Sequence, residues 1–324
     1  MKTYFYMFLA LAASNAVTLA VTVIYALHRF QHDNRESLTH EHFMISQPQS
    51  TSLSTVQLKQ AESTPKRITN ISYFTATVKP QLSTDTNTTI YFITPTYSRI
   101  TQKVDLTTLC QTLMLVPKLI WIVVEDSPNK TPMVTNLLTR CNVMSVHMNV
   151  ESPDTLAIEQ RYLGLKWVRD TCRVHSCNGV VYFGDDDNKY DLRLFETIRQ
   201  TQWVSVMNVA FAGGMYVEGP YCANGKTNQW RRGWGRRRQF PLDMAGFAVN
   251  VKVLEKYPNV WIGKSATNSN VKIGYMETTF LEMLGATKRS VECRSHPEEV
   301  LVWHIRTMKP KNMTSTPLNP PPEI

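Results

Sequence analysis

The chain has 324 residues, of which 43% are hydrophobic and 19% are charged, a balance typical of a globular protein with a sizeable core and not of a disordered chain. Its formal net charge of +9 indicates an anionic partner, such as a nucleic acid, a membrane surface or an acidic or phosphorylated small molecule. We expect one principal domain with appended segments.

The N-terminal segment is apolar enough to cross a membrane. No charged residue occurs from Tyr4 to Leu27, and this run exceeds the ~7–15 apolar residues of a secretory signal. A cleaved signal peptide is the alternative, because "LALAAS" offers the small residues of a cleavage site. We favour a short cytoplasmic tail and a transmembrane signal anchor over residues 1–30, with the rest of the chain in the lumen.

Glycosylation motifs and cysteines agree with a lumenal location. N-x-S/T motifs occur at Asn70, Asn87, Asn129 and Asn312. The six cysteines form no paired C-x-x-C pattern of a zinc site, so they predict disulfides or buried thiols, whose pairing the sequence leaves open. In this compartment nucleic acid is no longer an expected partner.

Composition divides the rest of the chain into three parts. Residues 31–88 are rich in Ser, Thr, Gln and His, without a sustained hydrophobic period, and predict a flexible stem. Residues 311–324 predict an irregular, proline-rich tail. The folded domain is therefore expected over residues 89–310.

Three short β-branched and aromatic runs predict strands buried on both faces of a parallel sheet. They extend from Ile90 to Thr94, from Leu119 to Asp126 and from Gly179 to Asp187. Between them, helical spacing of apolar residues predicts one helix around Leu106 to Met114 and another from about Leu156 to Arg169. This alternation indicates a Rossmann-like α/β unit.

Polar residues follow each predicted strand, and three of them are the consecutive aspartates Asp185, Asp186 and Asp187. Because the carboxyl ends of parallel strands meet at one edge of a sheet, these residues predict a shared crevice. No G-x-G-x-x-G follows the first strand, which argues against an ordinary dinucleotide site. The carboxylates instead predict a divalent cation that neutralises a diphosphate, the alternative being an acidic turn that caps a helix beginning near Asp191.

Seven blocks, in order from about Ile90 to Pro310, resemble the animal β-1,3-glucuronyltransferases of glycosyltransferase family 43. They are "ITPTYSR", "WIVVEDS", "EQRYLGLKW", "YFGDDDNKY", "FPLDMAGFAVN", "GYMETTFLE" and "LVWHIRT". The resemblance implies an α/β GT-A nucleotide-sugar transferase fold, with a Rossmann-like N-terminal half and an acceptor-binding half. It also implies UDP-glucuronate as donor, Mn²⁺ as cofactor, a type II Golgi membrane location and a homodimer.

The resemblance further implies a donor site built from residues far apart in the sequence. Asp187 is the implied metal ligand, with Asp185 and Asp186 near the ribose and the metal. Lys166 stands where relatives commonly carry arginine, and it keeps the charge but loses the planar fork of a guanidinium group. The residues implied to hold the uridine are Pro95, Tyr97, Asp126 and Arg161.

The block "LVWHIRT" adds two groups to this implied donor site. On a strand, His304 and Arg306 project from the same face, where they would meet the negative diphosphate. From the residues alone, a satisfied core histidine beside Trp303 is the preferred interpretation of His304. The resemblance favours phosphate contact instead.

The second half of the domain is implied to bind the acceptor and to supply a base. Glu218, Arg238 and Asp243 match the acceptor side of the family. Inverting transfer requires a base that takes the proton from the acceptor hydroxyl, and the match assigns this role to Glu277. The alternative is a first-turn glutamate favoured by the helix dipole.

The predicted function is therefore inverting transfer of glucuronate to the 3-OH of a terminal β-galactose. Three alternatives stay open: a family-43 xylosyltransferase, an inactive glycan-binding relative, and a metal-dependent phosphohydrolase. The sequence also leaves open whether the acceptor is a proteoglycan linker, N-acetyllactosamine or a broader set of galactose-terminated glycans.

Overall fold

The computed structural model describes residues 87–152, 157–233, 235, 238–262, 274–294 and 299–308. The chain divides into two units, Met1–Thr75 and Ala76–Ile324, and every described residue belongs to the second. The predicted anchor, most of the predicted stem and the proline-rich tail lie outside the described residues. Within the described part, no helix is both long and apolar enough for a membrane crossing.

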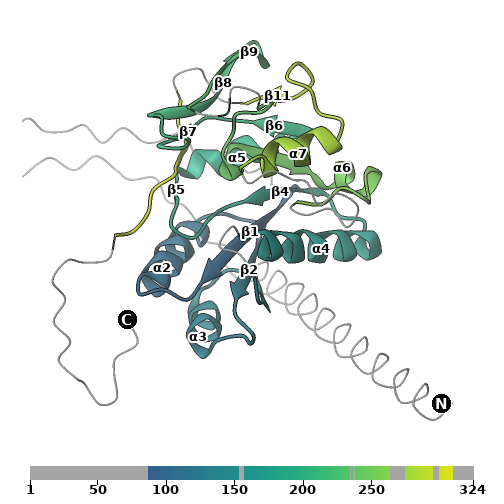
Figure 1. Cartoon of the computed structure of the whole chain (residues 1–324). Coiled ribbons are helices and arrows are strands. Elements are labelled where there is room, and N and C mark those ends of the chain that lie inside the picture. Colours follow the sequence, from purple (N-terminus) through teal and green to yellow (C-terminus); the bar gives the residue numbers. More distant parts are fainter. Residues whose placement is uncertain are drawn as a thin grey trace, which may run out of the picture. The chain divides into compact units, whose positions relative to one another are not determined.

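A seven-stranded sheet forms the centre of the domain, in the order β11-β6-β10-β4-β1-β2-β3 (Figure 1). β1, β2, β3 and β4 are mutually parallel where they pair, which confirms the parallel sheet predicted from the apolar runs. β10 joins antiparallel between β4 and β6. The strands are β1 (Thr89–Tyr97), β2 (Leu119–Asp126), β3 (Ser145–Val150), β4 (Gly179–Phe183), β6 (Val204–Val206), β10 (Phe247–Asn250) and β11 (Glu292–Cys293).

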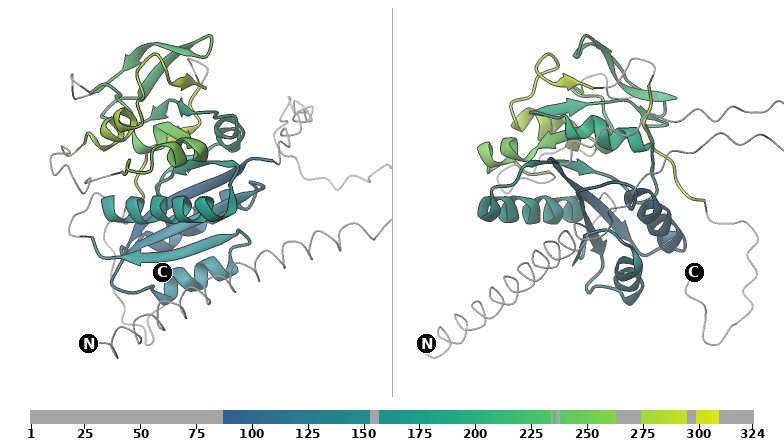
Figure 2. Two further views of the ribbon diagram at one scale, coloured as in Figure 1. Left: turned by 90° about the vertical axis from the view of Figure 1, so that its right-hand side faces the viewer. Right: turned by 180° about the vertical axis from the view of Figure 1, so that it is seen from behind.

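Helices cover both faces of this sheet, which is why its central strands are apolar without alternation. Ile90 and Phe92 of β1 pack in the cluster with α2, α3 and α5, whereas Tyr91 and Ile93 pack in the cluster with α4, α6 and α7. Figures 1 and 2 show α2 and α4 on opposite sides of β1. The helices are α2 (Gln102–Leu113), α3 (Pro132–Arg140), α4 (Ile158–His175), α5 (Leu192–Arg199), α6 (Val251–Lys256) and α7 (Met276–Met283).

The sequence predicted α2 and α4, and the structure shows where α4 ends and how α5 begins. α4 extends beyond the predicted end at Arg169 to His175, where Ser176 adopts a left-handed conformation with φ of 49°. A Cβ on Gly164 would lie 2.6 Å from the side chain of Ile93, so glycine permits α4 to lie close against β1. Asp191, and not the aspartate triplet, caps α5 by accepting from the backbone N–H of Arg193.

A smaller five-stranded sheet carries the other half of the domain, in the order β5-β12-β7-β8-β9. Its strands come from three separate parts of the sequence, so local periodicity gave no sign of it. A 3₁₀ helix, η1 (Met244–Gly246), precedes β10. The strands are β5 (Lys189–Tyr190), β7 (Val209–Ala210), β8 (Val217–Ala223), β9 (Lys226–Arg231) and β12 (Val302–Trp303).

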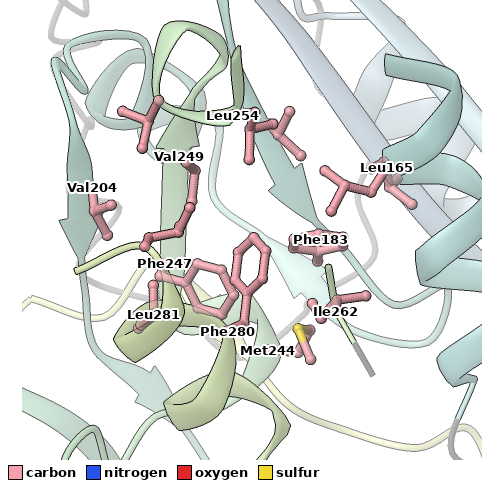
Figure 3. Packing of buried hydrophobic residues seen from close by; sticks show 14 of the residues in the cluster. Leu165, Phe183, Val204, Met244, Phe247, Val249, Leu254, Ile262, Phe280 and Leu281 are labelled. Atoms are coloured by element: carbon pink, nitrogen blue, oxygen red, sulfur yellow. The ribbon is translucent and has the colours of Figure 1, made fainter. Parts of the chain in front are cut away.

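An aromatic cluster fixes α7 against the large sheet. The ring centroids of Phe183, Phe247 and Phe280 lie 5.9 to 6.2 Å apart, and the Phe280 ring meets that of Phe183 edge to face. Figure 3 shows Leu281 beside Phe280 in the same cluster. This packing holds the first turn of α7, which contains Glu277, over the end of the sheet.

All six cysteines form disulfides, which resolves the choice that the sequence left open. The bonds join Cys110 to Cys141, Cys172 to Cys177, and Cys222 to Cys293. Of the four glycosylation motifs, Asn87 and Asn129 fall in the described part, and both are exposed.

Candidate active site

A cavity of about 390 Å³ lies at the carboxyl ends of β1, β2 and β4, where the sequence predicted a crevice. It brings together side chains from segments that span most of the domain. A second cavity, of about 420 Å³, lies between α4 and α6 and contains none of the predicted site residues. The site cavity is lined by Pro95, Thr96, Tyr97, Asp126, Ala157, Gln160, Arg161, Asp185, Asp186, Asp187, His304 and Arg306.

The first two aspartates of the triplet are held by cations and hydroxyls. Asp185 lies 2.5 Å from the guanidinium group of Arg161. Asp186 lies 2.8 Å from Arg99 and accepts a 2.6 Å hydrogen bond from the Thr96 hydroxyl. Burial raises the pKa of the Asp186 carboxyl, while Arg99 opposes this effect. Both carboxylates are therefore engaged by the protein itself.

The third aspartate differs, because its carboxylate has no hydrogen bond or ion pair with any described residue. β4 ends at Phe183, so Asp187 lies in the turn before β5 and not in the strand that the sequence predicted. Burial, together with the neighbouring Asp186 and Asp185 carboxylates, raises the pKa of Asp187 to about 6. An added positive charge would relieve this repulsion.

The structure corrects the predicted backbone conformation at His304 and Arg306. β12 ends at Trp303, so both residues follow the strand and do not lie on it. Both nevertheless line the cavity. The backbone N–H of His304 donates to Ala210 O at 2.9 Å and so holds this part of the chain beside β7. The imidazole Nδ1 of His304 lies 3.3 Å from Oδ2 of Asp243.

Two of the predicted acceptor residues form a buried ion pair. Glu218 and Arg238 lie 3.1 Å apart, and the side chain of each is only 2% exposed. Arg238 also donates to the carbonyl of Leu242. A Cβ on Gly213 would lie 2.6 Å from the Glu218 carboxylate, so the loop between β7 and β8 closes over this pair. Neither residue lines the cavity.

Asp243 and Glu277 connect the acceptor side to the cavity. Asp243 accepts from the backbone N–H of Ala245 and so caps η1. Burial raises the pKa of Asp243, whereas His304 opposes this effect. Because Asp243 also faces His304, it lies at the border between the two halves of the site.

Glu277 lies in the first turn of α7, and its Oε2 is buried without a hydrogen-bond partner among the described residues. Burial, with a smaller contribution from the nearby Asp243 carboxylate, raises the pKa of this carboxyl to about 7. A hydrogen bond from the backbone N–H of Glu277 itself and the charges of Arg238 and Arg161 oppose the shift. A partly buried carboxyl poised near neutral pH is suited to proton transfer.

Lys166 is the predicted donor residue that the structure does not bring to the cavity. It lies on the outer face of α4, where its ammonium group pairs with Asp170 one turn later at 2.5 Å. Its side chain is 47% exposed. The α-helical period explains the difference, because the five-residue step from Arg161 turns the side chain away from the cavity.

Sequence reasoning missed three residues that complete the site. Thr96 and Gln160 line the cavity, and Arg99 connects Asp186 to Asp105, which lies 2.8 Å from its guanidinium group. Thr96 and Arg99 belong to "ITPTYSR" and Gln160 to "EQRYLGLKW". Their presence in these blocks was the available signal.

The geometry defines a class of protein: an α/β enzyme with a polar ligand cavity at the carboxyl ends of parallel strands. Arginines, a histidine and carboxylates share its wall, as a ligand with phosphate and hydroxyl groups requires. A buried carboxyl with raised pKa lies next to this cluster.

Comparison with known proteins gives the family. Residues 109–308 match the model of glycosyltransferase family 43. The chain is 39% identical over 247 residues to galactosylgalactosylxylosylprotein 3-beta-glucuronosyltransferase 1 of Homo sapiens, covering 72% of this chain and 73% of that protein. It is 40% identical over 237 residues to galactosylgalactosylxylosylprotein 3-beta-glucuronosyltransferase sqv-8 of Caenorhabditis elegans, covering 68% of this chain and 65% of that protein. The chain belongs to glycosyltransferase family 43, and it is a glycosyltransferase homologous to the 3-beta-glucuronosyltransferases.

A search of solved structures finds more distant likeness. The structure of S. aureus TarS 1-349 in complex with UDP has 14% sequence identity and a TM-score of 0.42, over 66% of this chain and 60% of that chain. The likeness to the longer S. aureus TarS structure spans 36% of that chain, with 13% identity and a TM-score of 0.42.

Proposed function

We propose that this protein transfers glucuronate from UDP-glucuronate to the 3-OH of a terminal β-galactose, with inversion, on a GT-A fold. The observation that carries the proposal is Glu277. Among the described residues, one oxygen of this carboxyl is buried without a hydrogen-bond partner, and the pKa of the carboxyl is raised to about 7 in the neighbourhood of Asp243, Arg238 and Arg161. The names of the homologues supply the sugar and the linkage.

Donor binding is assigned to the cavity wall. Pro95, Tyr97, Asp126 and Arg161 hold the uridine, with Asp185 and Asp186 near the ribose. Tyr97 is 56% exposed at the rim and therefore accessible for stacking on a nucleobase. The imidazole of His304 and the guanidinium group of Arg306 face the diphosphate from the chain after β12.

The residues present are compatible with a divalent metal ion bound mainly by ligands from the nucleotide. Among the described residues there is no group of three or more side chains able to hold a metal ion. Asp187, however, presents a carboxylate without a partner among these residues, and Mn²⁺ favours such oxygen ligands. When bound, Mn²⁺ would supply charge neutralisation for the diphosphate leaving group.

Glu277 acts as the general base in this proposal. The acceptor 3-oxygen attacks C1 of the glucuronate opposite UDP, the bond from C1 to the diphosphate oxygen breaks, and Glu277 takes the hydroxyl proton. Asp243, between His304 and η1, is placed to orient the acceptor galactose. The buried Glu218–Arg238 ion pair stabilises the part of the fold that is assigned to the acceptor.

The cellular part of the proposal is a Golgi membrane protein with a lumenal catalytic domain, acting as a homodimer. Three disulfides support an oxidising compartment. The acceptor is a galactose-terminated glycan of a glycoprotein or proteoglycan.

A substrate panel tests the function directly. The purified protein is incubated with UDP-glucuronate or UDP-xylose and with Gal-Gal-Xyl or N-acetyllactosamine glycosides, with and without Mn²⁺. We expect a β1,3-linked glucuronate product that depends on Mn²⁺, with UDP released in equal amount. Transfer of xylose, or release of phosphate without an acceptor, would contradict the proposal.

A further inference from the structure

Gln160 is a buried residue of the cavity wall with an unsatisfied side-chain amide. The residue is 1% exposed, and neither Nε2 nor Oε1 has a hydrogen-bond partner among the described residues. Buried amides in folded proteins are normally hydrogen-bonded, and an exception requires an explanation. Gln102 follows the rule at 3% exposure, because its Nε2 donates to Thr96 Oγ1 at 3.1 Å.

A local structural role does not explain this amide. Gln160 is the third residue of α4, a position from which glutamine often accepts the N-cap backbone N–H. The N-cap residue is Ala157, in a left-handed conformation with φ of 55°, and no side-chain bond caps the helix. The amide thus contributes no hydrogen bond to the fold of the described domain.

The other polar groups on this side of the cavity are already engaged by the protein. Asp126 accepts from the backbone N–H of Ser152 at 2.9 Å, and Arg161 pairs with Asp185 at 2.5 Å. Gln160 also lines the cavity, and its neutral amide offers both a hydrogen-bond donor and an acceptor.

The chemistry of the amide selects the part of the nucleotide that it contacts. Nε2 requires an acceptor and Oε1 requires a donor, whereas an ionised diphosphate offers acceptors alone. Uracil presents an N–H beside a carbonyl, and ribose presents hydroxyls, so the nucleoside satisfies both atoms. We propose that Gln160 is a specificity residue that binds the nucleoside part of UDP; this inference rests on the proposed function.

Binding requires a small rotation of the Gln160 side chain, because both polar atoms are covered in this structure. The unpaired amide has no hydrogen bond to lose in this rotation. UDP therefore gains hydrogen bonds without breaking one between described residues, which favours a measurable contribution of Gln160 to affinity.

The test compares Gln160→Met with the wild-type protein by titration calorimetry with UDP and with inorganic pyrophosphate, both in the presence of Mn²⁺. Methionine retains the length of the side chain but has no amide. We expect UDP to bind about 10-fold more weakly, equivalent to about 1.4 kcal/mol. The affinity for pyrophosphate, which lacks a nucleoside, is expected to stay unchanged.

The melting temperature of the ligand-free protein distinguishes a role in UDP binding from a role in stabilising the fold. Gln160→Met is expected to keep or raise the melting temperature, because it removes an unsatisfied polar group. The matched control Gln102→Met removes a satisfied amide and is expected to lower it. Gln160→Leu provides a second variant with the same expectation as Gln160→Met.

Three results would overturn the assignment of Gln160. They are wild-type UDP affinity in both Gln160 variants, an equal loss of affinity for UDP and pyrophosphate, or a fall in melting temperature as large as that of Gln102→Met. If the wild-type protein itself fails to bind UDP, the proposed function fails and the role of Gln160 fails with it. Normal wild-type binding therefore separates the two hypotheses.

Discussion

Replacing Glu277 with glutamine separates its proposed chemical role from its structural effect. The amide keeps the shape of the side chain but accepts no proton, so a general base predicts a fall in kcat of ~10²–10⁴. UDP affinity is expected to change little, because Glu277 does not line the donor cavity. In the wild-type protein, kcat is expected to rise as the pH increases through about 7 and the carboxyl ionises.

The same substitution has a predicted effect on stability, and its sign follows from proton linkage. The pKa of Glu277 rises from an ordinary value of 4.5 to about 7 in the folded state. Between these values the folded state binds more protons than the unfolded state, so this group lowers stability as the pH rises. At about 1.4 kcal/mol per pH unit, the effect reaches about 3 kcal/mol above neutrality.

Glu277→Gln removes this penalty. Relative to the wild-type protein, we expect the variant to gain up to about 3 kcal/mol in unfolding free energy between about pH 5 and about pH 8. For a domain of this size the gain corresponds to ~6–12 °C in melting temperature. The assay is thermal and urea unfolding of the ligand-free protein at both pH values, together with steady-state kinetics on the same preparation.

Glu282→Gln is the matched control, because Glu282 is an exposed glutamate of the same helix. It is expected to leave kcat and the pH dependence of stability close to wild type. A kcat for Glu277→Gln within a few-fold of wild type at saturating substrate would refute the base role, and Asp243 would then be tested. An equal pH dependence of stability in Glu277→Gln and wild type would refute the raised pKa.

Four further changes test other parts of the site and fold. Asp187→Asn is expected to abolish Mn²⁺-dependent UDP binding in calorimetry without loss of folding, because the carboxylate has no partner in the described part of the chain; wild-type Mn²⁺ dependence would exclude it as a metal ligand. Arg238→Met removes the guanidinium partner of the Glu218 carboxylate, whose side chain is 2% exposed, and is expected to lower the unfolding free energy measured in urea by about 3–5 kcal/mol. A decrease below about 1 kcal/mol would show that the pair is not buried as described. Lys166→Ala is expected to leave UDP affinity unchanged, because the side chain pairs with Asp170 outside the cavity; a tenfold loss would support the donor role that the family resemblance implies. Replacing Cys222 and Cys293 by alanine opens a loop with a sequence separation of 71 and is expected to cost about 4 kcal/mol; no change in melting temperature would contradict that contribution.

The sequence alone predicted the parallel sheet and the edge at which the site lies. Continuous β-branched runs such as Leu119 to Asp126 fit strands covered on both faces, and periodic leucines fit α2. Polar residues directly after such strands must meet at one edge, so the grouping of Asp126 with the triplet followed from local pattern and the geometry of parallel sheets. The order of the family's blocks identified most of the remaining cavity residues.

Tertiary structure decided what each of these side chains does. The three aspartates are equivalent in the sequence, but Arg161 holds Asp185, and Arg99 and Thr96 hold Asp186. Of the three, only the Asp187 carboxylate has no partner among the described residues. Lys166 faces away from the cavity because the turn of the helix separates it from Arg161. Partners, disulfide pairing and burial depend on which distant segments meet.

The pKa of Glu277 and the unsatisfied amide of Gln160 likewise have no local sequence signal. Both arise from desolvation by elements that are remote in the chain: the aromatic cluster under α7 positions one, and the packing of α4 on the sheet positions the other. A sequence specifies which groups are available for chemistry. Their protonation and their unused hydrogen bonds depend on the solvent that folding removes, and this is set by the tertiary structure.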